Sequence, residues 1–548
     1  MFQSLLSSLL EETSQRSLWL AAPELALTAG IVLLLLGRLL SFDRVIPPHW
    51  LALLSAMTAF GFSLFLFNEL NRHSDLAGPF FSGLMVFDQF GALVRVFLLL
   101  FLVFVLALTV LSGIPDREDA PDFYTLLMGA VIGMLLMCSG NHLLMIFLGI
   151  EMASVPSYAM AGFLKGKKKG SEAALKFAVF GAGAAGVMLY GISLLAGMLG
   201  TGSFPEIAVR LTEVFGQTVE ASPEGNGAAA LLLRSSAIRT LLLAALMIFV
   251  GFAFKLSLVP FHFWTPDAFE GAAAEVGGFL SVASKAAAFA LLTRFVVTLL
   301  SASSATLNEI YLVLGIGVGV IAAVTATFGN LAAYSQTNMK RLLAYSTIAH
   351  AGYMLMAIAA LMVLHAGGTE ATSSLGERSA RTVEGLLYYL AVYLFMNLGA
   401  FAITALIRNE IFSEEIEDYR GLGYQAPLLC AGMGACLFSL VGLPPLGGFI
   451  GKLMIFASLY DAGHVHWSMW ALLGIGGLNT VLSLFYYLNV LKTMYLSERP
   501  VTARVATFPA MSSAGFYVLL VTLPILYLGI DVRMVSNAAR RAAEVLFH

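Results

Sequence analysis

Residues 255–272 read KLSLVPFHFWTPDAFEGA, and they interrupt a long apolar run that begins at Leu241. The stretch places a lysine, a histidine and two prolines where an apolar helix would otherwise cross a membrane. Pro260 has no backbone N–H, so it cannot donate to the carbonyl of Leu256, the residue directly after Lys255. A carbonyl left free at membrane depth is tolerated only where it lines a cavity in the protein or faces water. The stretch therefore predicts a broken membrane helix with a polar interior beside it.

The composition of the whole chain is typical of a membrane protein. The chain has 548 residues, of which 59% are hydrophobic and only 11% are charged, and its mean hydropathy is +0.87. A soluble domain of this size carries about a quarter charged residues. The apolar runs approach or exceed the ~20 residues that fill the hydrocarbon core of a bilayer, and they lack the period-two alternation of membrane β-strands. We therefore predict an all-α polytopic membrane protein.

Counting the apolar runs predicts about fourteen membrane spans. They are 18–37, 50–67, 88–112, 122–138, 143–164, 173–199, 240–263, 275–300, 309–332, 341–364, 385–408, 427–459, 468–496 and 513–531. The run at 427–459 is too long for one straight helix and contains GLPPLGGFIGK, so we expect a second break there. Pro444 and Pro445 free the carbonyls of Leu440 and Val441, as the proline does in the first break.

The orientation follows from the number of spans and from the basic loops. An even number of spans places both termini on one side of the membrane. Lysine and arginine are in modest excess on the opposite side, where KGKKKG at 165–170 is a short basic loop of the kind that stays in the cytoplasm. We therefore expect both termini outside the cytoplasm. The long connections 200–239 and 364–384 are rich in small and polar residues, and we expect external linkers there.

The composition also disfavours some function classes. A net charge of −3 is too small to suggest a nucleic-acid partner. Cys138, Cys430 and Cys436 form no C-x-x-C pair, and the sequence has no iron–sulfur or zinc spacing. We therefore expect no redox centre, cofactor or metal on this chain.

Ionisable residues in the middle of predicted spans are the candidates for function, because an ionised side chain there costs about 2.5–3.5 kcal/mol on insertion scales. They are Glu151, Lys176, Lys255, His262, Lys285, His350 and Lys452. Other polar residues recur at helical spacing on the same spans, so these faces point away from lipid. Further charges lie nearer to span ends, where long side chains can snorkel to water. They are Glu24, Asp88, Arg95, Arg294 and Lys492.

The two breaks suggest how such lysines could work. A lysine lies near each break, Lys255 before the first and Lys452 after the second, and paired broken helices are typical of inverted-repeat transporters. Glu151 is the candidate partner of Lys255, and a lysine whose partner can move away can release a proton. A structural interpretation stays open, because a buried Lys–Glu pair can serve packing alone. The two histidines can likewise be satisfied interior groups, and Lys176 can form an i, i+4 pair with Glu172.

The residues at the first break resemble the antiporter-like subunits of respiratory complex I and their relatives among cation/proton antiporters. The signature is VPFHFWTPDAFEGA at 259–272, followed by SVASKAAAF at 281–289. Within this group, the chain most resembles the subunit N family of NADH-quinone oxidoreductases. Four stretches carry this resemblance: LGIEMASVPSYAMAG, SEAALKFAVFGAGAAGVMLYG, GNLAAYSQTNMKRLLAYSTIAHAGY and SLVGLPPLGGFIGKLMIF. The resemblance covers residues from about 120 to 500. It departs at Ala273, Ala274 and Glu275, where the family usually has Pro-Thr-Pro after EGA.

The resemblance implies fourteen transmembrane helices, with two inverted five-helix repeats and two broken helices. The parts would be 1–120 with helices 1–3, 121–300 as the first repeat with helices 4–8, 301–500 as the second repeat with helices 9–13, and 501–548 with the C-terminal helix and tail. By motif, the residues that resemble the proton relay of the family are Glu151, Lys255, Lys285 and Lys452. Lys176, His262 and His350 are candidate helpers, and the helix breaks are at Pro260, Pro444 and Pro445.

The implied function is that of a proton-translocating membrane subunit of an NADH-quinone oxidoreductase in a bacterial-type inner (cytoplasmic) membrane. NAD, FMN, iron–sulfur clusters and quinone would be bound by other subunits. The expected partners are the other membrane and peripheral subunits of complex I, especially neighbouring antiporter-like subunits, and the lipid bilayer. Two alternatives stay open: a subunit of an Mrp-type cation/proton antiporter without redox coupling, and a purely structural membrane anchor.

Overall fold

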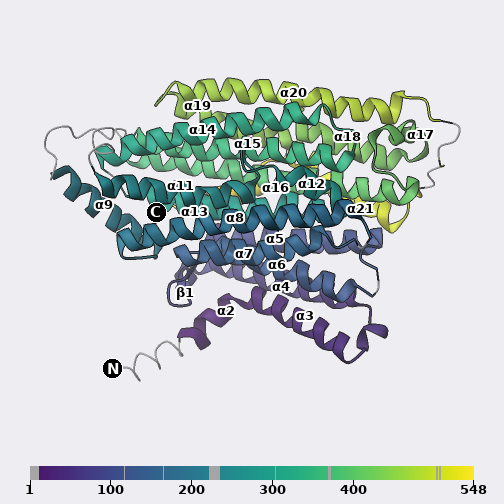
Figure 1. Ribbon diagram of the computed structural model, residues 1–548, viewed down its shortest axis with the longest axis horizontal. Coiled ribbons are helices and arrows are strands. Elements are labelled where there is room, and N and C mark those ends of the chain that lie inside the picture. The colour runs from purple at the N-terminus through teal and green to yellow at the C-terminus, as the bar shows by residue number, and fades with distance from the viewer. Residues whose placement is uncertain are drawn as a thin grey trace.

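The computed structural model of the protein describes residues 12–116, 118–164, 166–220, 235–302, 304–367, 372–500, 504 and 508–547. In these residues, 13 helices are long and apolar enough to cross a membrane. They are α3 (Ala22–Leu39), α4 (Pro48–Arg72), α5 (Gln89–Ser112), α6 (Ala120–Ser139), α7 (Leu143–Ala161), α8 (Lys168–Leu199), α11 (Ser236–Leu256), α13 (Ala274–Leu300), α14 (Ala305–Ala333), α15 (Met339–Ala366), α16 (Thr372–Ile411), α20 (Ser468–Leu496) and α21 (Ser513–Ile530). Figure 1 shows them running along one common direction, from α3 at the lower edge to α20 at the upper edge. The predicted all-α polytopic fold is confirmed.

The remaining predicted span, 427–459, consists of two shorter helices. α18 (Pro427–Val441) and α19 (Gly447–Gly463) meet at the segment that contains Pro444 and Pro445. The other break separates α11 from the short helix α12 (Trp264–Gly271), and Pro260 lies in the segment between them. Both predicted breaks are therefore confirmed. The division into two inverted repeats at the residues given above stays a prediction.

Two connections contain helices where we expected linkers. α9 (Phe204–Glu220) lies within 200–239, and α16 already begins at Thr372. The prediction of plain linkers is wrong for these segments, while 221–234 and 368–371 lie outside the described residues. The buried apolar residues of α9 recur at helical spacing, and the helix packs against α8 and α13. They are Phe204, Ile207, Ala208, Leu211 and Phe215. That spacing was the sequence signal for an amphipathic helix.

Short elements cover the ends of the long helices. β1 (Gly78–Phe80) and β2 (Met85–Phe87) form an antiparallel hairpin in which Pro79 pairs with Val86. Helix α22 (Arg533–Glu544) packs against α5 and α16. The short helices α2 (Leu18–Leu20) and α17 (Leu422–Gln425) lie at opposite ends of the long helices in Figure 1. Single turns are η1 (Thr13–Ser17), η2 (Phe42–Arg44), η3 (Ser74–Leu76) and η4 (Ile416–Tyr419). Lys165 of the basic loop lies outside the described residues.

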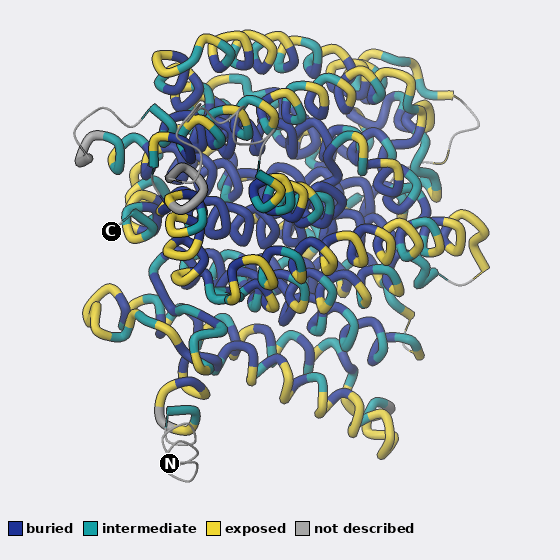
Figure 2. Tube along the Cα trace, turned by 60° about the vertical axis from the view of Figure 1, so that its left-hand side comes forward, coloured by how far each residue is buried: buried dark blue, intermediate teal, exposed yellow. Residues whose placement is uncertain are grey.

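The core of the molecule is built around α13, α15 and α16. The apolar stretch of α15 is buried throughout, and those of α13 and α16 are almost entirely buried, whereas α3, α4 and α8 expose most of theirs. Figure 2 shows buried residues gathered in the middle of the molecule and exposed residues on the outer helices. Exposed leucine, valine and phenylalanine side chains on these outer helices suit contact with lipid. Lys285 on α13 and His350 on α15 are buried in this core and are therefore far from both lipid and bulk water.

Buried ion pairs hold the first helices against this core. Arg294 on α13 donates to both carboxylate oxygens of Asp88, at 2.6 and 2.9 Å, and to the carbonyl of Cys138 at 3.2 Å. Arg95 on α5 pairs with Glu24 on α3, and Arg95 is only 1% exposed. The expectation that these two arginines snorkel to water is wrong, because each has a carboxylate within reach on a neighbouring segment.

The substitution Asp88→Ala is expected to lower the free energy of unfolding by about 3–5 kcal/mol, because it leaves the buried charge of Arg294 without its partner. The measurement is a titration of the detergent-solubilised protein with a denaturing detergent. Glu213→Ala is the control, because it removes an exposed pair with Arg210 at 2.9 Å and should cost about 1 kcal/mol or less. Equal losses for the two variants would contradict the role assigned to Asp88.

Candidate functional site

The first helix break presents backbone carbonyls to the interior. α11 ends at Leu256, and Ser257 has a left-handed backbone conformation with φ of 61°, so the helix stops before Pro260. Lys285 on α13 donates to the carbonyl of Leu256 at 2.6 Å and to the hydroxyl of Ser257 at 2.9 Å. The carbonyl that the proline was predicted to free is therefore bound by an ammonium group.

The second break uses a lysine in the same way. α18 ends at Val441 and is followed by Gly442, whose φ of 91° is strained for any residue with a side chain. Lys452 on α19 donates to the carbonyls of Leu440 and Val441, at 3.0 and 2.9 Å. These carbonyls are at the C-terminal end of α18, where the backbone dipoles favour a positive charge. Lys285 of α13 binds the corresponding carbonyl at the C-terminal end of α11. At each break, the carbonyls at the end of the preceding helix therefore accept hydrogen bonds from a buried lysine.

Lys255, the lysine within the first broken helix, has a different partner. Lys255 is 2% exposed, and its Nζ donates to the hydroxyl of Ser154 on α7 at 2.9 Å. Glu151 lies one turn before Ser154 and acts on Lys255 through its charge. The direct pair that the sequence suggested between Glu151 and Lys255 is therefore replaced by a hydroxyl contact. The carboxylate and the amine are neighbours that do not form an ion pair.

His350 connects the central helices with the second break. Its Nδ1 lies 2.5 Å from the hydroxyl of Tyr389 on α16, and its ring centroid is 5.7 Å from that of Tyr353 on α15. Lys452 Nζ lies 4.3 Å from the centroid of the Tyr353 ring. The histidine, the two tyrosines and the lysine therefore form one buried cluster, and the faces expected from helical spacing on α15 and α16 do meet.

A hydrogen bond joins α13 and α16 in the core. Asn397 Nδ2 donates to the Ser281 hydroxyl at 2.7 Å, while the Oδ1 of Asn397 is buried without a hydrogen-bond partner among the described residues. Ser281 is one turn from Lys285, and Asn397 shares a face of α16 with Tyr389. Polar groups therefore follow one another across the middle of the molecule, from Lys255 through Lys285, Asn397 and His350 to Lys452. We call these five residues and Ser154, Ser257, Ser281, Tyr353 and Tyr389 the buried polar row.

The two other predicted helpers lie apart from this row. His262 is buried between the rings of Phe263 and Phe328, with centroid distances of 4.4 Å to each, and its Nδ1 has no partner among the described residues. Lys176 pairs with Glu172 at 2.7 Å and with Asp267 at 2.6 Å, and 38% of its side chain is exposed. Lys176 therefore belongs to a polar network near the surface, as its i, i+4 spacing from Glu172 had suggested.

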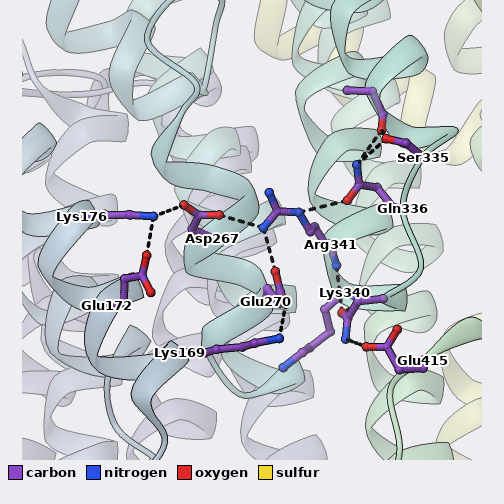
Figure 3. Close-up of polar contacts among 12 residues, drawn as sticks. Lys169, Glu172, Lys176, Asp267, Glu270, Ser335, Gln336, Lys340, Arg341 and Glu415 are labelled. Carbon is purple, nitrogen blue, oxygen red and sulfur yellow. Dashed lines mark hydrogen bonds and ion pairs between the residues drawn. The ribbon is translucent and has the colours of Figure 1, made fainter.

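Figure 3 shows this surface network, in which Arg341 lies between two carboxylates of α12. Arg341 donates to Asp267 at 2.8 Å and to Glu270 at 2.7 Å, and Glu270 also pairs with Lys169 at 2.7 Å. These groups surround a cavity of about 200 Å³. The sequence analysis did not single out Asp267, Glu270 or Arg341. Their signal was the clustering of charges in TPDAFEG and NMKR, at the ends of predicted spans.

Ion pairs lower the pKa values of the two carboxyl groups in this network, Asp267 and Glu270. Burial alone would raise the pKa of the Asp267 carboxyl, but the hydrogen bonds from Lys176 and Arg341 outweigh it and hold that pKa below its ordinary value of 3.8. For Glu270, burial likewise acts against the hydrogen bonds from Lys169 and Arg341, which again prevail and lower the pKa. Both carboxylates are therefore charged at neutral pH and hold α8, α12 and α15 together at this end.

A group whose pKa is lowered by folding stabilises the protein above its ordinary pKa, and the contribution is lost as the pH falls through the folded value. The melting temperature of the detergent-solubilised protein should therefore fall on acidification below about pH 4. In Asp267→Asn the protein should melt lower at neutral pH, and its decline in acid should be shallower. Parallel pH curves for the variant and the natural chain would contradict this account.

The described part of the chain contains no group of three or more His, Cys, Asp or Glu residues placed to hold a metal ion. Its three cysteines are buried free thiols. The buried polar row consists of amines, hydroxyls, an amide and an imidazole, and the amines, hydroxyls and imidazole among them are groups that can exchange protons.

Comparisons with known proteins agree with this geometry. Residues 140–483 match the family model described as NADH:quinone oxidoreductase/Mrp antiporter, TM. A protein of Chlorobium chlorochromatii named NADH-quinone oxidoreductase subunit N is 37% identical over 93% of this chain and 93% of its own length. A chain of respiratory complex I from Thermus thermophilus is 28% identical, with a TM-score of 0.69 over 94% of this chain and 98% of that chain. A chain of the Mrp complex from Dietzia is 18% identical, with a TM-score of 0.75 over 97% of this chain and 98% of that chain, and so shares the fold.

Proposed function

Because the chain belongs to the NADH:quinone oxidoreductase/Mrp antiporter family, we propose that it is a proton-translocating membrane subunit of an NADH-quinone oxidoreductase. Protons would move along the buried polar row, between Lys255, Lys285, His350 and Lys452, with Glu151 as the carboxylate that acts on the first of them. The observation that carries the proposal is the placement of Lys285 and Lys452 on the carbonyls that the two helix breaks leave free. These carbonyls give an amine in the bundle interior a hydrogen-bond partner without a counter-ion in contact.

Neutral partners make the lysines able to exchange protons. Lys255 faces a hydroxyl, Lys285 faces a carbonyl and a hydroxyl, and Lys452 faces two carbonyls. A carboxylate in contact would hold the ammonium form by its charge, whereas dipoles leave the protonation state sensitive to other charges nearby. Positive charges on Lys255 and Lys285 at the same time would repel each other. Arrival of a proton at one lysine therefore favours release from the next.

The proposal includes a place in a larger assembly. Electron transfer through NAD, FMN, iron–sulfur clusters and quinone would occur on other subunits, and their redox reaction would drive proton movement here. The neighbouring subunits would be other antiporter-like chains in a bacterial-type inner membrane, with the termini of this chain outside the cytoplasm. The parts 121–300 and 301–500 would be the two transport halves, each with one broken helix. The likeness to a chain of respiratory complex I at 28% identity supports this arrangement.

The alternative is a subunit of an Mrp-type cation/proton antiporter, which has the same fold and needs no electron carrier. The solved Mrp chain shares only 18% identity, whereas the curated relative named for NADH-quinone oxidoreductase shares 37%. Affinity purification of the native chain from its own membranes should therefore bring down iron–sulfur subunits and NADH oxidation activity. Recovery of only further membrane subunits, with cation-dependent proton exchange, would favour the Mrp type.

The substitution Lys255→Ala in the assembled complex should reduce proton pumping and coupled quinone reduction at least about tenfold, because it removes a proton-carrying group. The measurements are proton uptake by proteoliposomes and NADH oxidation with quinone. NADH oxidation with a water-soluble electron acceptor should be unchanged, which reports that the complex is assembled.

The matched control is Lys492→Ala, because Lys492 is an exposed lysine on α20 away from the buried polar row. This variant should pump normally. If a complex in which Lys255, Lys285 and Lys452 are all replaced by alanine pumps normally, only the role of a structural membrane anchor is left for this chain.

A further inference from the structure

A buried carboxylate lies at the start of α13, the helix that carries Lys285. Glu275 is 0% exposed, and its Oε1 accepts a hydrogen bond from Arg408 of α16 at 3.2 Å. Its other oxygen is buried without a hydrogen-bond partner among the described residues. Glu275 occupies a position where the family that the chain resembles usually has proline.

Charged groups connect Glu275 with the surface. Arg408 is partly exposed and is followed by the exposed Asn409 at the end of α16. Lys340 at the start of α15 donates to the carbonyl of Ala272, three residues before Glu275, and pairs with Glu414 at 2.8 Å. Glu275 is thus the innermost group of a charged cluster that reaches water on its outer side.

Polar groups also continue inward from Glu275 along α13. Ser281 and Lys285 follow it by six and ten residues, which corresponds to about 9 and 15 Å along the helix axis. The helices α13 and α16 run antiparallel, and two hydrogen bonds join their side chains: Glu275–Arg408 and, further along α13, Ser281–Asn397. The second contact belongs to the buried polar row and contains the unpartnered Oδ1 of Asn397. The interface between α13 and α16 therefore contains two polar pairs, each with one acceptor oxygen that has no hydrogen-bond partner among the described residues.

An aromatic ring separates the two pairs. Gly277 and Gly278 of α13 face Phe401 of α16, and a Cβ atom on Gly277 would lie only 2.9 Å from the ring. Phe401 is fully buried, and its ring centroid is 5.8 Å from that of Phe269 on α12. The ring fills the interface between α13 and α16 because the two glycines have no side chains there. A proton could pass from Glu275 to Ser281 only when this ring moves and water enters.

On the basis of the proposed function, we propose that Glu275 is a further proton-carrying residue of this chain, which takes a proton from the Arg408 side and delivers it past Phe401 to Lys285. The carboxylate would accept a proton from water at the charged cluster and become a neutral carboxyl. That proton would then pass through water and the Ser281 hydroxyl, which Asn397 holds in place, to the neutral amine of Lys285, which becomes an ammonium group. Arg408 stays charged throughout and favours the return of Glu275 to the carboxylate. Phe401 separates loading from delivery.

The test is made in the assembled complex, with pumping by proteoliposomes normalised to NADH oxidation with a water-soluble acceptor. Glu275→Gln keeps the size and the hydrogen-bond acceptor but cannot carry a proton, so pumping should fall several-fold. Glu275→Asp keeps the carboxyl and should restore most of the pumping. Glu24→Gln is the matched control, because it neutralises the other buried Glu–Arg pair, outside the buried polar row, and it should pump normally.

Each other outcome overturns the proposal. Normal pumping by Glu275→Gln would show that no proton passes through this position. Equal losses in Glu275→Gln and Glu275→Asp, or an equal loss in Glu24→Gln, would assign the effect to packing. If Glu275→Gln does not assemble, Glu275→Gln/Arg408→Gln removes both charges and avoids an uncompensated arginine, and the same loss is expected. A failure of the proposed function itself is distinguished by normal pumping in Lys255→Ala.

Discussion

Backbone carbonyls that lose their helical partner inside a membrane must find another donor, and this requirement organises the structure. Water is absent from the hydrocarbon region, so every free carbonyl there needs a donor from the protein or from a cavity. The prolines at the two breaks create such carbonyls, and Lys285 and Lys452 supply the donors. The same contact stabilises the positive charge of a protonated lysine, because the C-terminal end of a helix has a negative partial charge. Broken helices and buried amines are therefore two parts of one solution.

The two breaks are related but not identical. At the second break, Lys452 from the helix that follows the break binds the carbonyls that precede it. At the first break, the corresponding contact comes from Lys285 on the next long helix, and Lys255 before the break is left to the hydroxyl of Ser154. The first break therefore has two buried amines, Lys255 and Lys285, whereas the second has one amine in a cluster with an imidazole and tyrosines. The two breaks thus differ in the chemistry of their polar groups.

Charge is arranged in two zones. The buried polar row has amines with neutral partners, whereas the network of Asp267, Glu270 and Arg341 has close ion pairs around a small cavity. Ion pairs fix charges and positions, so the network suits a rigid attachment of α12 to α8 and α15. Neutral dipoles leave charge free to change, so the row suits transfer. Glu275 combines features of both zones, because one of its oxygens is in an ion pair and the other has no hydrogen-bond partner among the described residues.

Hydropathy alone determined the number and approximate position of the membrane spans, and the prolines determined which carbonyls would be free. Both are local properties, since a span depends on its own apolar residues and a proline removes a particular backbone donor. The partners of the charged groups were decided only by the tertiary structure. The sequence suggested Glu151 as the partner of Lys255 and allowed Arg95 to snorkel to water, whereas packing brought Ser154 to Lys255 and Glu24 to Arg95. A partner is set by the rotation and approach of helices far apart in sequence, and helical spacing within one span contains no information about either.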